Sequence, residues 1–481
     1  MIKQKNFKTE ADKIVNWIDG YFKRLNTLPV KSHATPREVY DKIPCEAPLE
    51  GEDMESIIKD LDSIILPGVT HWQHPSFHAY FPANSSYESL LGEMVTAAIG
   101  AQCMVWETSP AAAELEERMT EWMARAAGLP DAFTGVIQDS ASSATLVAII
   151  TARERATQFR SNIDGVPQGL RVYCSPEAHS SIEKGVGVAG IGRSNLVQIE
   201  TDSEQRMIPE KLERAICDDL AAGFTPICVV AAIGTTGTLA IDPLSEIAAI
   251  CVKYKVWLHV DAAFAGTAML LPEYRYICKG IEYADSLVFN PHKWMFVNFD
   301  CSLYYVKDAK LLVRTFDILP EYLKTTTHGQ VNDYRDWGIP LGRRFRALKL
   351  WFVLRGFGLD GIRQRLREQI ALNEYFVDMI LQSGRFMLLK KPFLGFTLFC
   401  VCGDDAVSER LLAAVNGSGE IYLSHTKVDG HFAIRFHATQ TYIGKDDVEK
   451  AVETLERYLD TIFVLQTPGS NSRQLLKHPS P

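Results

Sequence analysis

The sequence predicts an α/β protein whose large domain contains a mainly parallel, doubly wound sheet. From about residue 87, short apolar runs alternate with helical stretches, which is the pattern of parallel strands joined by crossover helices. The chain has 481 residues, 47% of them hydrophobic, which is enough to build the buried core that such a sheet needs. A shorter α/β pattern near the C-terminus indicates a second, smaller domain.

Residues 1–86 are expected to form a helical segment that has no core of its own. Apolar residues recur at three-to-four spacing over 8–28 and 51–66, and a proline-rich connection separates the two stretches. A segment this small must bury its apolar face against something else. We therefore expect it to pack on a second copy of the chain, as a dimerisation segment.

The large domain is expected over residues 87–346. Helices over 141–159, 209–222 and 243–254 separate several of its strands. In such sheets ligands bind beyond the carboxyl ends of the strands, so polar residues that follow strands are the candidate site residues. The expected strands are Gly135–Gln138, Arg171–Cys174, Leu196–Glu200, Ile227–Ile233, Val256–Val260, Ser286–Phe289 and Ser302–Val306.

A long helical stretch over 347–382 opens the smaller α/β domain, which is expected to end at residue 465. Residues 466–481 are rich in proline, glycine, serine and asparagine and are expected to be disordered.

Composition argues against several other classes of protein. A net charge of -9 disfavours nucleic acid as the main partner. The sequence contains neither the apolar core of a signal peptide at its start nor a stretch of about 20 apolar residues, so we expect a cytoplasmic protein without a membrane span. The ten cysteines are scattered without a Cys-x-x-Cys motif, which predicts reduced thiols and no metal site.

Lys293 is the most informative residue of the sequence. It follows the apolar run Ser286–Phe289 within the string Asn-Pro-His-Lys-Trp, in a short loop stiffened by Pro291. Desolvation there would lower the pKa of the amine and make it nucleophilic, and a nucleophilic lysine forms Schiff bases with carbonyl compounds such as pyridoxal phosphate. Taken alone, the string is also compatible with a structural loop.

Four further segments place polar residues after expected strands. Asp261 ends an apolar strand and would need a buried partner such as a pyridinium nitrogen, although a structural aspartate is an equal alternative. Ala141 and Ser142 begin a helix whose free N–H groups could bind a phosphate, or a serine of this segment could simply cap the helix. His179 could stack on a flat ring or act as an acid or base, although a lone histidine is more often structural. Gly234–Thr238 forms a loop that carries hydroxyl groups, or a simple turn.

In this order the motifs resemble the aromatic-L-amino-acid decarboxylases, the group II pyridoxal-phosphate-dependent decarboxylases of fold type I. The resemblance covers roughly residues 8–460 and implies an aspartate-aminotransferase-like fold with a seven-stranded sheet in the large domain. The motifs that carry it are Ser-Ala-Ser, Ala-His-Ser-Ser, Gly-Thr-Thr, Val-Asp-Ala-Ala-Phe-Ala-Gly and Asn-Pro-His-Lys-Trp, with His71–Pro75, Ala79–Pro82, Asp333–Arg335 and Pro340–Arg346 outside the cofactor site.

The resemblance implies a role for each site residue. Lys293 would bind the cofactor aldehyde, Asp261 would pair with the pyridine nitrogen, His179 would stack on the ring, and Tyr322 would deliver a proton to Cα. The remaining cofactor contacts would be Ala141, Ser142, Thr236, Ala263, Ser286, Asn290 and His292. Asp139 stands where animal relatives carry glycine, and a carboxylate beside a phosphate is unfavourable unless it points away.

The substrate residues are matched less closely. Trp72, Tyr80, Phe81 and Pro82 match the family's aromatic-binding wall, to which His179 would also contribute, while Phe264 replaces a common tyrosine. Ala83, Gln102 and Met104 differ from residues common in the family, and Gly342 would leave space near the substrate ring.

The resemblance implies a homodimeric enzyme that decarboxylates aromatic L-amino acids (Trp, Tyr, DOPA, Phe or 5-hydroxytryptophan) to arylalkylamines. Relatives with phenylalanine in place of Tyr322 are aldehyde synthases, which is the first alternative. A catalytically silent scaffold that binds pyridoxal phosphate is the second.

Overall fold

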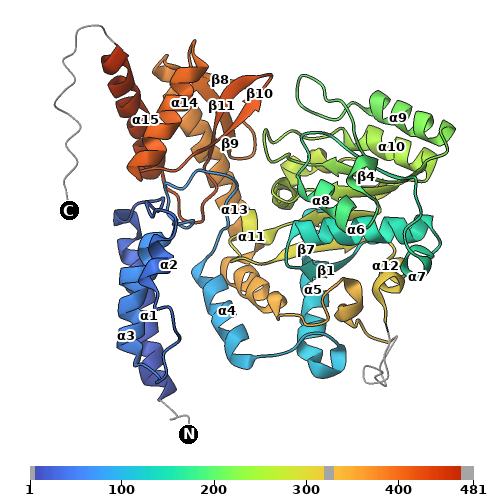
Figure 1. The fold of residues 1–481 in the computed structure, drawn as a ribbon, viewed down its shortest axis with the longest axis horizontal. Coiled ribbons are helices and arrows are strands. Elements are labelled where there is room, and N and C mark those ends of the chain that lie inside the picture. Colours follow the sequence, from blue (N-terminus) through green and yellow to red (C-terminus); the bar gives the residue numbers. More distant parts are fainter. Residues whose placement is uncertain (1–5, 319–329, 467–481) are drawn as a thin grey trace. The chain divides into compact units, whose positions relative to one another are not determined.

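The computed structural model describes residues 6–318 and 330–466, which form two compact units (Figure 1). Unit 1 combines Met1–Tyr80 with Ala371–Pro481, and unit 2 comprises Phe81–Ile370. The expected domain boundaries at residues 86, 346 and 465 stay a prediction. Residues 467–481, where disorder is expected, lie outside the described residues.

Unit 2 is built on a seven-stranded sheet, which confirms the predicted fold class. Strand β7 runs antiparallel to both of its neighbours, β1 and β6, and all other neighbouring strands are parallel. Each strand lies where the sequence predicts one. In spatial order they are β1 (Thr134–Gln138), β7 (Ser302–Val306), β6 (Ser286–Phe289), β5 (Trp257–Asp261), β4 (Thr225–Ala232), β2 (Leu170–Cys174) and β3 (Leu196–Gln198).

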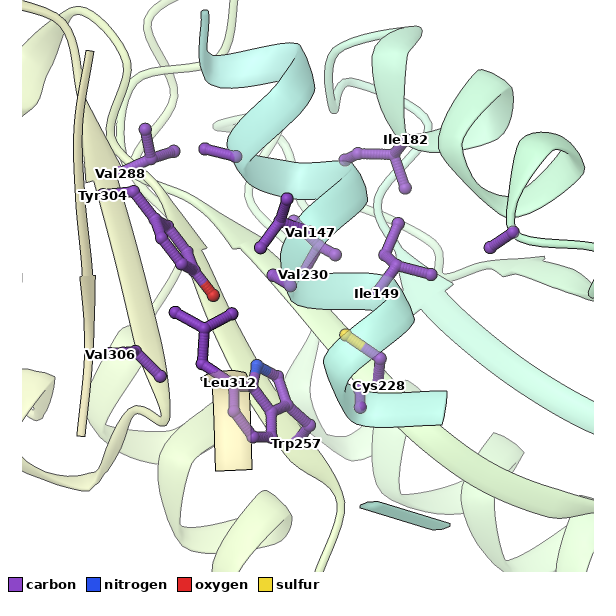
Figure 2. Packing of buried hydrophobic residues seen from close by; sticks show 14 of the residues in the cluster. Val147, Ile149, Ile182, Cys228, Val230, Trp257, Val288, Tyr304, Val306 and Leu312 are labelled. Carbon is purple, nitrogen blue, oxygen red and sulfur yellow. The ribbon is translucent and has the colours of Figure 1, made fainter. Parts of the chain in front are cut away.

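Helix α6 (Ala141–Ala156) lies across this sheet and contacts five of its strands. Figure 2 shows its Val147 and Ile149 packed in one cluster with Val230 of β4 and Tyr304 of β7, all fully buried. The cluster also includes Ile182 from α8 (Ser181–Val188) and Leu312 from α12 (Ala309–Phe316). This packing holds the first turn of α6 at the carboxyl edge of β1.

The other helices of unit 2 connect the strands or flank them. Helix α13 (Arg346–Gln382) continues into unit 1, and Gly358 interrupts it with a φ of 67°, a conformation that favours glycine. The remaining α-helices are α4 (Tyr87–Ile99), α5 (Pro110–Ala127), α7 (Ser161–Asp164), α9 (Pro209–Ala221), α10 (Leu244–Tyr254) and α11 (Pro291–Trp294). Short 3-10 helices span Trp106–Thr108, Arg193–Asn195, Ala265–Leu270, Pro272–Cys278, Ile281–Tyr283 and Tyr334–Trp337.

Unit 1 contains the N-terminal helices and a small antiparallel sheet. None of the residues of α1 (Phe7–Arg24), α2 (Glu38–Lys42) or α3 (Met54–Asp60) is buried, as expected of a segment without its own core. A π-helix (Leu61–Ile65) and 3-10 turns (Leu25–Thr27, Leu66–Gly68) follow these helices. The sheet has the order β10 (Ser424–Val428), β11 (His431–His437), β9 (Phe396–Val401), β8 (Phe386–Leu388), and it packs with α14 (Asp405–Ser418) and α15 (Lys445–Gln466).

Candidate active site

A cavity of about 290 Å³ lies in unit 2 where the carboxyl ends of β4, β5 and β6 meet the start of α6. This is the edge at which ligands bind in open α/β sheets. Most of the residues predicted to bind a cofactor line it. The lining residues are Phe81, Ser140, Ala141, Ser142, His179, Ala232, Gly234, Thr235, Thr236, Asp261, Ala263, Phe264, Asn290, His292, Lys293 and Phe299.

Lys293 is held at the cavity by the aromatic residue that follows it. The Trp294 side chain is fully buried, its indole N–H donates to Oε1 of Gln369 at 2.8 Å, and its ring stacks on Phe264 with centroids 4.9 Å apart. Phe264 in turn stacks on Phe81 at 4.0 Å, and Nζ of Lys293 lies 5.9 Å from the centre of the Phe81 ring. This stack leaves the lysine little freedom to turn away from the cavity.

The surroundings of Lys293 favour its neutral amine. Burial lowers the pKa of Lys293 below its usual value, while the nearby charge of Asp261 opposes the shift. A larger fraction of neutral amine at a given pH makes the group a better nucleophile. The structure therefore agrees with the chemistry expected of this lysine from its sequence context.

Asp261 is the last residue of β5 and is 9% exposed. Its Oδ1 accepts a hydrogen bond from the Ala263 N–H at 3.1 Å, and the carboxylate has no ion-pair partner within 4 Å in the described part of the chain. A buried carboxylate without a counter-charge is costly unless a cation reaches it. A protonated ring nitrogen in the cavity would supply that cation.

The start of α6 has the properties of an anion site. Ser140 caps the helix by accepting the Ser143 N–H at 3.2 Å, and the first-turn N–H groups of a helix have no intrahelical acceptor. On the same cavity lining, Oδ1 of Asn290 is buried without a hydrogen-bond partner among the described residues. An unpaired buried polar atom beside a helix start fits a polar ligand such as a phosphate group.

Asp139 is not among the residues that line the cavity. The unfavourable contact between its carboxylate and a phosphate, which the sequence suggested, is therefore not expected in this cavity. The Ser140 hydroxyl donates to its carboxylate at 3.4 Å. The guanidinium of Arg346 binds Asp300 at 2.9 Å; burial lowers the pKa of Arg346, but Asp300 and the charge of Asp139 together raise it above its usual value.

The loop after β4 depends on a glycine that lines the cavity. Gly234 has a φ of 90°, and a Cβ there would lie 2.8 Å from Cβ of Ala265. A side chain at this position would therefore be strained in conformation and would clash. The glycine lets the chain turn so that Thr235 and Thr236 reach the cavity.

Ser286, by contrast, lies outside the cavity lining. Its hydroxyl accepts the indole N–H of Trp257 at 2.9 Å and bonds Nδ1 of His259 at 2.9 Å, and the side chain is fully buried. The resemblance placed it near the cofactor, yet Ser286 is the first residue of β6 and therefore lies at the edge opposite to the carboxyl end of that strand. A direct contact between Ser286 and a ligand in this cavity has no geometric support.

Of the residues expected to bind the substrate, Phe81 and His179 line this cavity. Trp72 and Tyr80 belong to unit 1, where their rings stack at 5.8 Å and remain 38% and 48% exposed. The others lie in unit 2 but are not among the lining residues: Pro82, Ala83, Gln102, Met104 and Gly342. Tyr322 lies outside the described residues.

Gln102 and Gly342 lie close to each other. Oε1 of Gln102 accepts the Arg343 N–H at 2.8 Å, and a Cβ at Gly342 would lie 3.2 Å from Nε2 of Gln102. The carbonyl of Met104 accepts the Arg335 N–H at 2.9 Å. Gln102 and Met104 therefore contact the segment 335–343, which contains Gly342. None of these three predicted substrate residues lines the cavity of the same chain.

Phe299 lines the cavity and was not anticipated from the sequence. Its side chain is 63% exposed, and its ring lies 4.7 Å from that of His292. No local pattern marks it, because Met295, Phe296 and Val297 just before it are apolar as well. Thr235, within the predicted loop Gly234–Thr238, also lines the cavity, as does Ala232, which was not predicted.

The sequence and the fold are both similar to those of known decarboxylases. Residues 36–402 match the family model described as the pyridoxal-dependent decarboxylase conserved domain. An aromatic-L-amino-acid decarboxylase of Manduca sexta is 38% identical over 97% of this chain and 93% of its own length. A histidine decarboxylase of Drosophila melanogaster is also 38% identical over 98% of this chain, which spans 57% of that longer protein.

Among solved structures, the Oryza sativa enzyme described as TDC with PLP and tryptamine superimposes with a TM-score of 0.93. It is 30% identical, and the match covers 96% of this chain and 99% of that one. Across residues 6–318 and 330–466, no helix has the length and apolar character needed to span a membrane.

Proposed function

The chain belongs to the pyridoxal-dependent decarboxylase family, and on this basis we propose that it converts aromatic L-amino acids into arylalkylamines and CO2. The family is one of carboxy-lyases that use pyridoxal phosphate. The observation that carries the finer proposal is the aromatic wall of the cavity, where Phe81, Phe264 and Phe299 lie on the same lining as Lys293 and Asp261.

The residues present fit the cofactor. Lys293 would bind it covalently, Asp261 would hold a proton on its pyridine nitrogen, and the start of α6 with Asn290 would bind its phosphate. When bound, pyridoxal phosphate supplies an electron sink that stabilises the negative charge left on Cα as CO2 departs. The unpaired carboxylate of Asp261 and the unpaired Oδ1 of Asn290 support this assignment.

Lys293 has two tasks in this proposal. Its lowered pKa increases the fraction of neutral amine that could bind a carbonyl carbon, and the amine would stay within the cavity when a substrate amine takes its place. The Trp294–Phe264–Phe81 stack keeps the lysine near for the return step. Tyr322 is proposed as the proton donor to Cα, by resemblance alone.

Aromatic side chains are the substrates best matched to the lining. Flat rings gain from offset stacking on Phe81 and Phe299, by about 0.5–1.5 kcal/mol per pair beyond the area that they bury. The described lining contains one lysine and no arginine that could bind a second carboxylate, and the proposed role of that lysine, Lys293, already occupies it. Acidic amino acids are therefore disfavoured as substrates.

Histidine is the second candidate substrate, because the histidine decarboxylase of Drosophila melanogaster is as similar as the aromatic-L-amino-acid decarboxylase of Manduca sexta. An imidazole ring is flat, like a phenol or an indole, but it is more polar. The phenylalanine-rich lining favours the less polar rings.

A substrate panel tests the proposal. The cofactor-loaded protein would be incubated with Phe, Tyr, DOPA, Trp, 5-hydroxytryptophan, His and Glu, and CO2, amine, aldehyde and hydrogen peroxide would be measured. We expect amine equal to CO2 for at least one aromatic acid, at a kcat/KM at least tenfold above that for His. A preference for His or Glu would overturn the aromatic assignment, and peroxide equal to CO2 would indicate an aldehyde synthase.

We further propose that the protein is a homodimer. Helix α4 exposes an apolar stripe at helical spacing, formed by Tyr87, Leu91, Met94, Val95 and Ile99, each at least 39% exposed. An exposed stripe of this kind is typical of an interface. Several predicted substrate residues do not line the cavity of their own chain. In a dimer these residues could line the cavity of the partner chain, which supports the proposal. A cytoplasmic location stays a prediction.

A further inference from the structure

The two histidines that line the cavity share one arrangement of hydrogen bonds. In each ring Nδ1 lies within reach of a backbone N–H: that of Ser181 is 3.2 Å from Nδ1 of His179, and that of Cys301 is 2.9 Å from Nδ1 of His292. A backbone amide can only donate a hydrogen bond. Nδ1 must therefore carry a lone pair in both rings.

Ser181 supplies a second donor to His179. Its hydroxyl lies 2.8 Å from the same Nδ1, and because that nitrogen has no proton, the hydroxyl must donate. Ser181 is the first residue of α8, so its N–H has no acceptor within the helix and is free for this contact. The local chain thus presents two donors and no acceptor to Nδ1 of His179.

We propose that Ser181 and the amide of Cys301 hold both cavity histidines in the neutral form that is protonated on Nε2. Each imidazole then donates a hydrogen bond through Nε2, and neither carries a charge. Ser181 is a positioning residue in this scheme, because it acts through His179. The inference rests on the proposed function only in taking this cavity as the cofactor site.

The charged neighbours of both rings are consistent with neutral imidazoles. Desolvation lowers the pKa of His179; Asp261 opposes this shift, and Lys293 adds to it. Burial lowers the pKa of His292 to about 3; Lys293 and Lys349 add to the shift, while Asp300 and a backbone hydrogen bond with Cys301 oppose it.

A neutral pair of histidines has a consequence for the cofactor. An imidazolium at His179 would repel a protonated pyridine ring held by Asp261, whereas a neutral ring would not. At the phosphate end, His292 would contribute an N–H donor without adding charge. The two histidines should then add no pH dependence of their own to cofactor affinity across the range in which an ordinary histidine titrates.

Ring-nitrogen chemical shifts test the proposal. The protein would be labelled with ¹⁵N and ¹³C in histidine, with and without cofactor, and His179→Asn and His292→Asn would assign the two signals. At pH 7 we expect an unprotonated Nδ1 and a protonated Nε2 in both rings. A protonated Nδ1 in either ring, as the other tautomer or as imidazolium, would overturn the proposal.

A matched pair of variants isolates Ser181. Ser181→Asp replaces the hydroxyl donor by a charged acceptor, and Ser180→Asp adds the same charge one residue away, at an exposed position that makes no capping bond. We expect Ser181→Asp to raise the titration midpoint of His179 by about one to three pH units, and Ser180→Asp to raise it by much less. Equal shifts in the two variants would refute a positioning role for Ser181.

Ser181→Ala completes the series. It removes the hydroxyl but keeps the amide, so we expect the tautomer to persist and the midpoint to rise by less than in Ser181→Asp. The cofactor dissociation constant at pH 7 should increase more in Ser181→Asp than in Ser180→Asp. Absence of amine production would refute the proposed function but would leave the nitrogen shifts unchanged, so the two failures are distinguishable.

Discussion

Lys293 combines a lowered pKa with a fixed position. Burial makes the amine nucleophilic, and the stack of Trp294, Phe264 and Phe81 keeps it at the cavity. The sequence predicted this residue because its cues are local: an apolar strand, a proline and a buried tryptophan occur within nine residues, 286–294. Contacts such as that between Ser181 and Nδ1 of His179 depend on ring orientation, which no sequence pattern specifies.

Replacing Lys293 with alanine should abolish turnover. We expect kcat to fall on the order of a thousand-fold or more, because both the covalent anchor and the amine are lost. Steady-state amine production checks this, with Lys307→Ala as the control at a lysine outside the cavity lining that hydrogen-bonds the carbonyl of Glu282. Comparable activity in both variants would remove Lys293 from the mechanism.

Asp261→Asn should lower the rate of the chemical step more than it weakens substrate binding. The amide is similar in size but cannot balance a positive ring nitrogen, so we expect kcat to fall on the order of 10²–10⁴-fold with a smaller change in KM. The fold should survive, because the acceptor for the Ala263 N–H remains. An unchanged kcat would contradict the pairing of Asp261 with the cofactor.

Tyr322→Phe tests the residue that lies outside the described part of the chain. If Tyr322 protonates Cα, its loss should shift products from amine toward aldehyde with release of peroxide. The ratio of amine to aldehyde is the measurement. A ratio equal to that of the wild type would disprove the assignment of Tyr322.

Among the secondary-structure elements, α6 links the core to the anion site. Its buried face packs on the sheet, so its first turn is held beside Asn290 and His292 on the cavity lining. The seven strands and α6 could be predicted because apolar runs and helical periodicity are local patterns. The place of Ser286 could not, since its hydroxyl partners Trp257 and His259 lie on the neighbouring strand.

Ile149→Ala should destabilise unit 2 through this helix. The side chain is fully buried, and truncating a buried isoleucine to alanine costs about 2–5 kcal/mol because a cavity remains. The urea midpoint of unfolding, followed by tryptophan fluorescence, is the readout. Ile163→Ala, at a side chain that is 73% exposed, is the control and should leave the midpoint nearly unchanged. Equal midpoints for both variants would contradict this view of the core.

At the scale of the whole molecule, several buried histidines tie stability to pH. Burial lowers the pKa of His78 and His437 to about 3 and that of His259 to about 4, below the usual 6.5. A group whose pKa is lower in the folded state contributes stability that is present above its unfolded pKa and is lost as pH falls. The free energy of unfolding should therefore decline as pH drops below about 6.5.

His437→Gln should reduce that decline. Each such histidine contributes a slope of up to about 1.4 kcal/mol per pH unit between its folded and unfolded pKa values. Urea titrations between pH 5 and pH 8 would measure the slope, and His431→Gln, at an exposed position of the same strand, is the control. A slope unchanged by His437→Gln would contradict the burial of an uncharged His437.

The apolar stripe of α4 predicts the state of assembly. Leu91→Arg should convert a dimer into a monomer at micromolar concentration, because a charge would be buried in the interface. Light scattering after size-exclusion chromatography measures the mass, with Ile163→Arg as the control on α7. A dimer that persists in Leu91→Arg would exclude this stripe as the interface.

The grouping of the chain into units depends on long-range contacts and was not readable from local patterns. The N-terminal segment and the C-terminal sheet belong to one compact unit, although the whole of unit 2 separates them in the sequence. Within unit 1, the Tyr80 N–H donates to Ser424, and His437 bonds the carbonyl of Ala79. Such pairings join residues more than 300 positions apart, and periodicity carries no information about them.

The attachment of the cofactor to Lys293 is tested most directly by borohydride reduction of the cofactor-loaded protein, followed by peptide mass spectrometry. Reduction makes the lysine–cofactor bond permanent, so the modified residue can be identified. We predict one phosphopyridoxyl group per chain, on the peptide that contains Lys293. Modification of a different lysine, or none at all in protein that produces amine, would contradict the assignment of Lys293 and of this cavity.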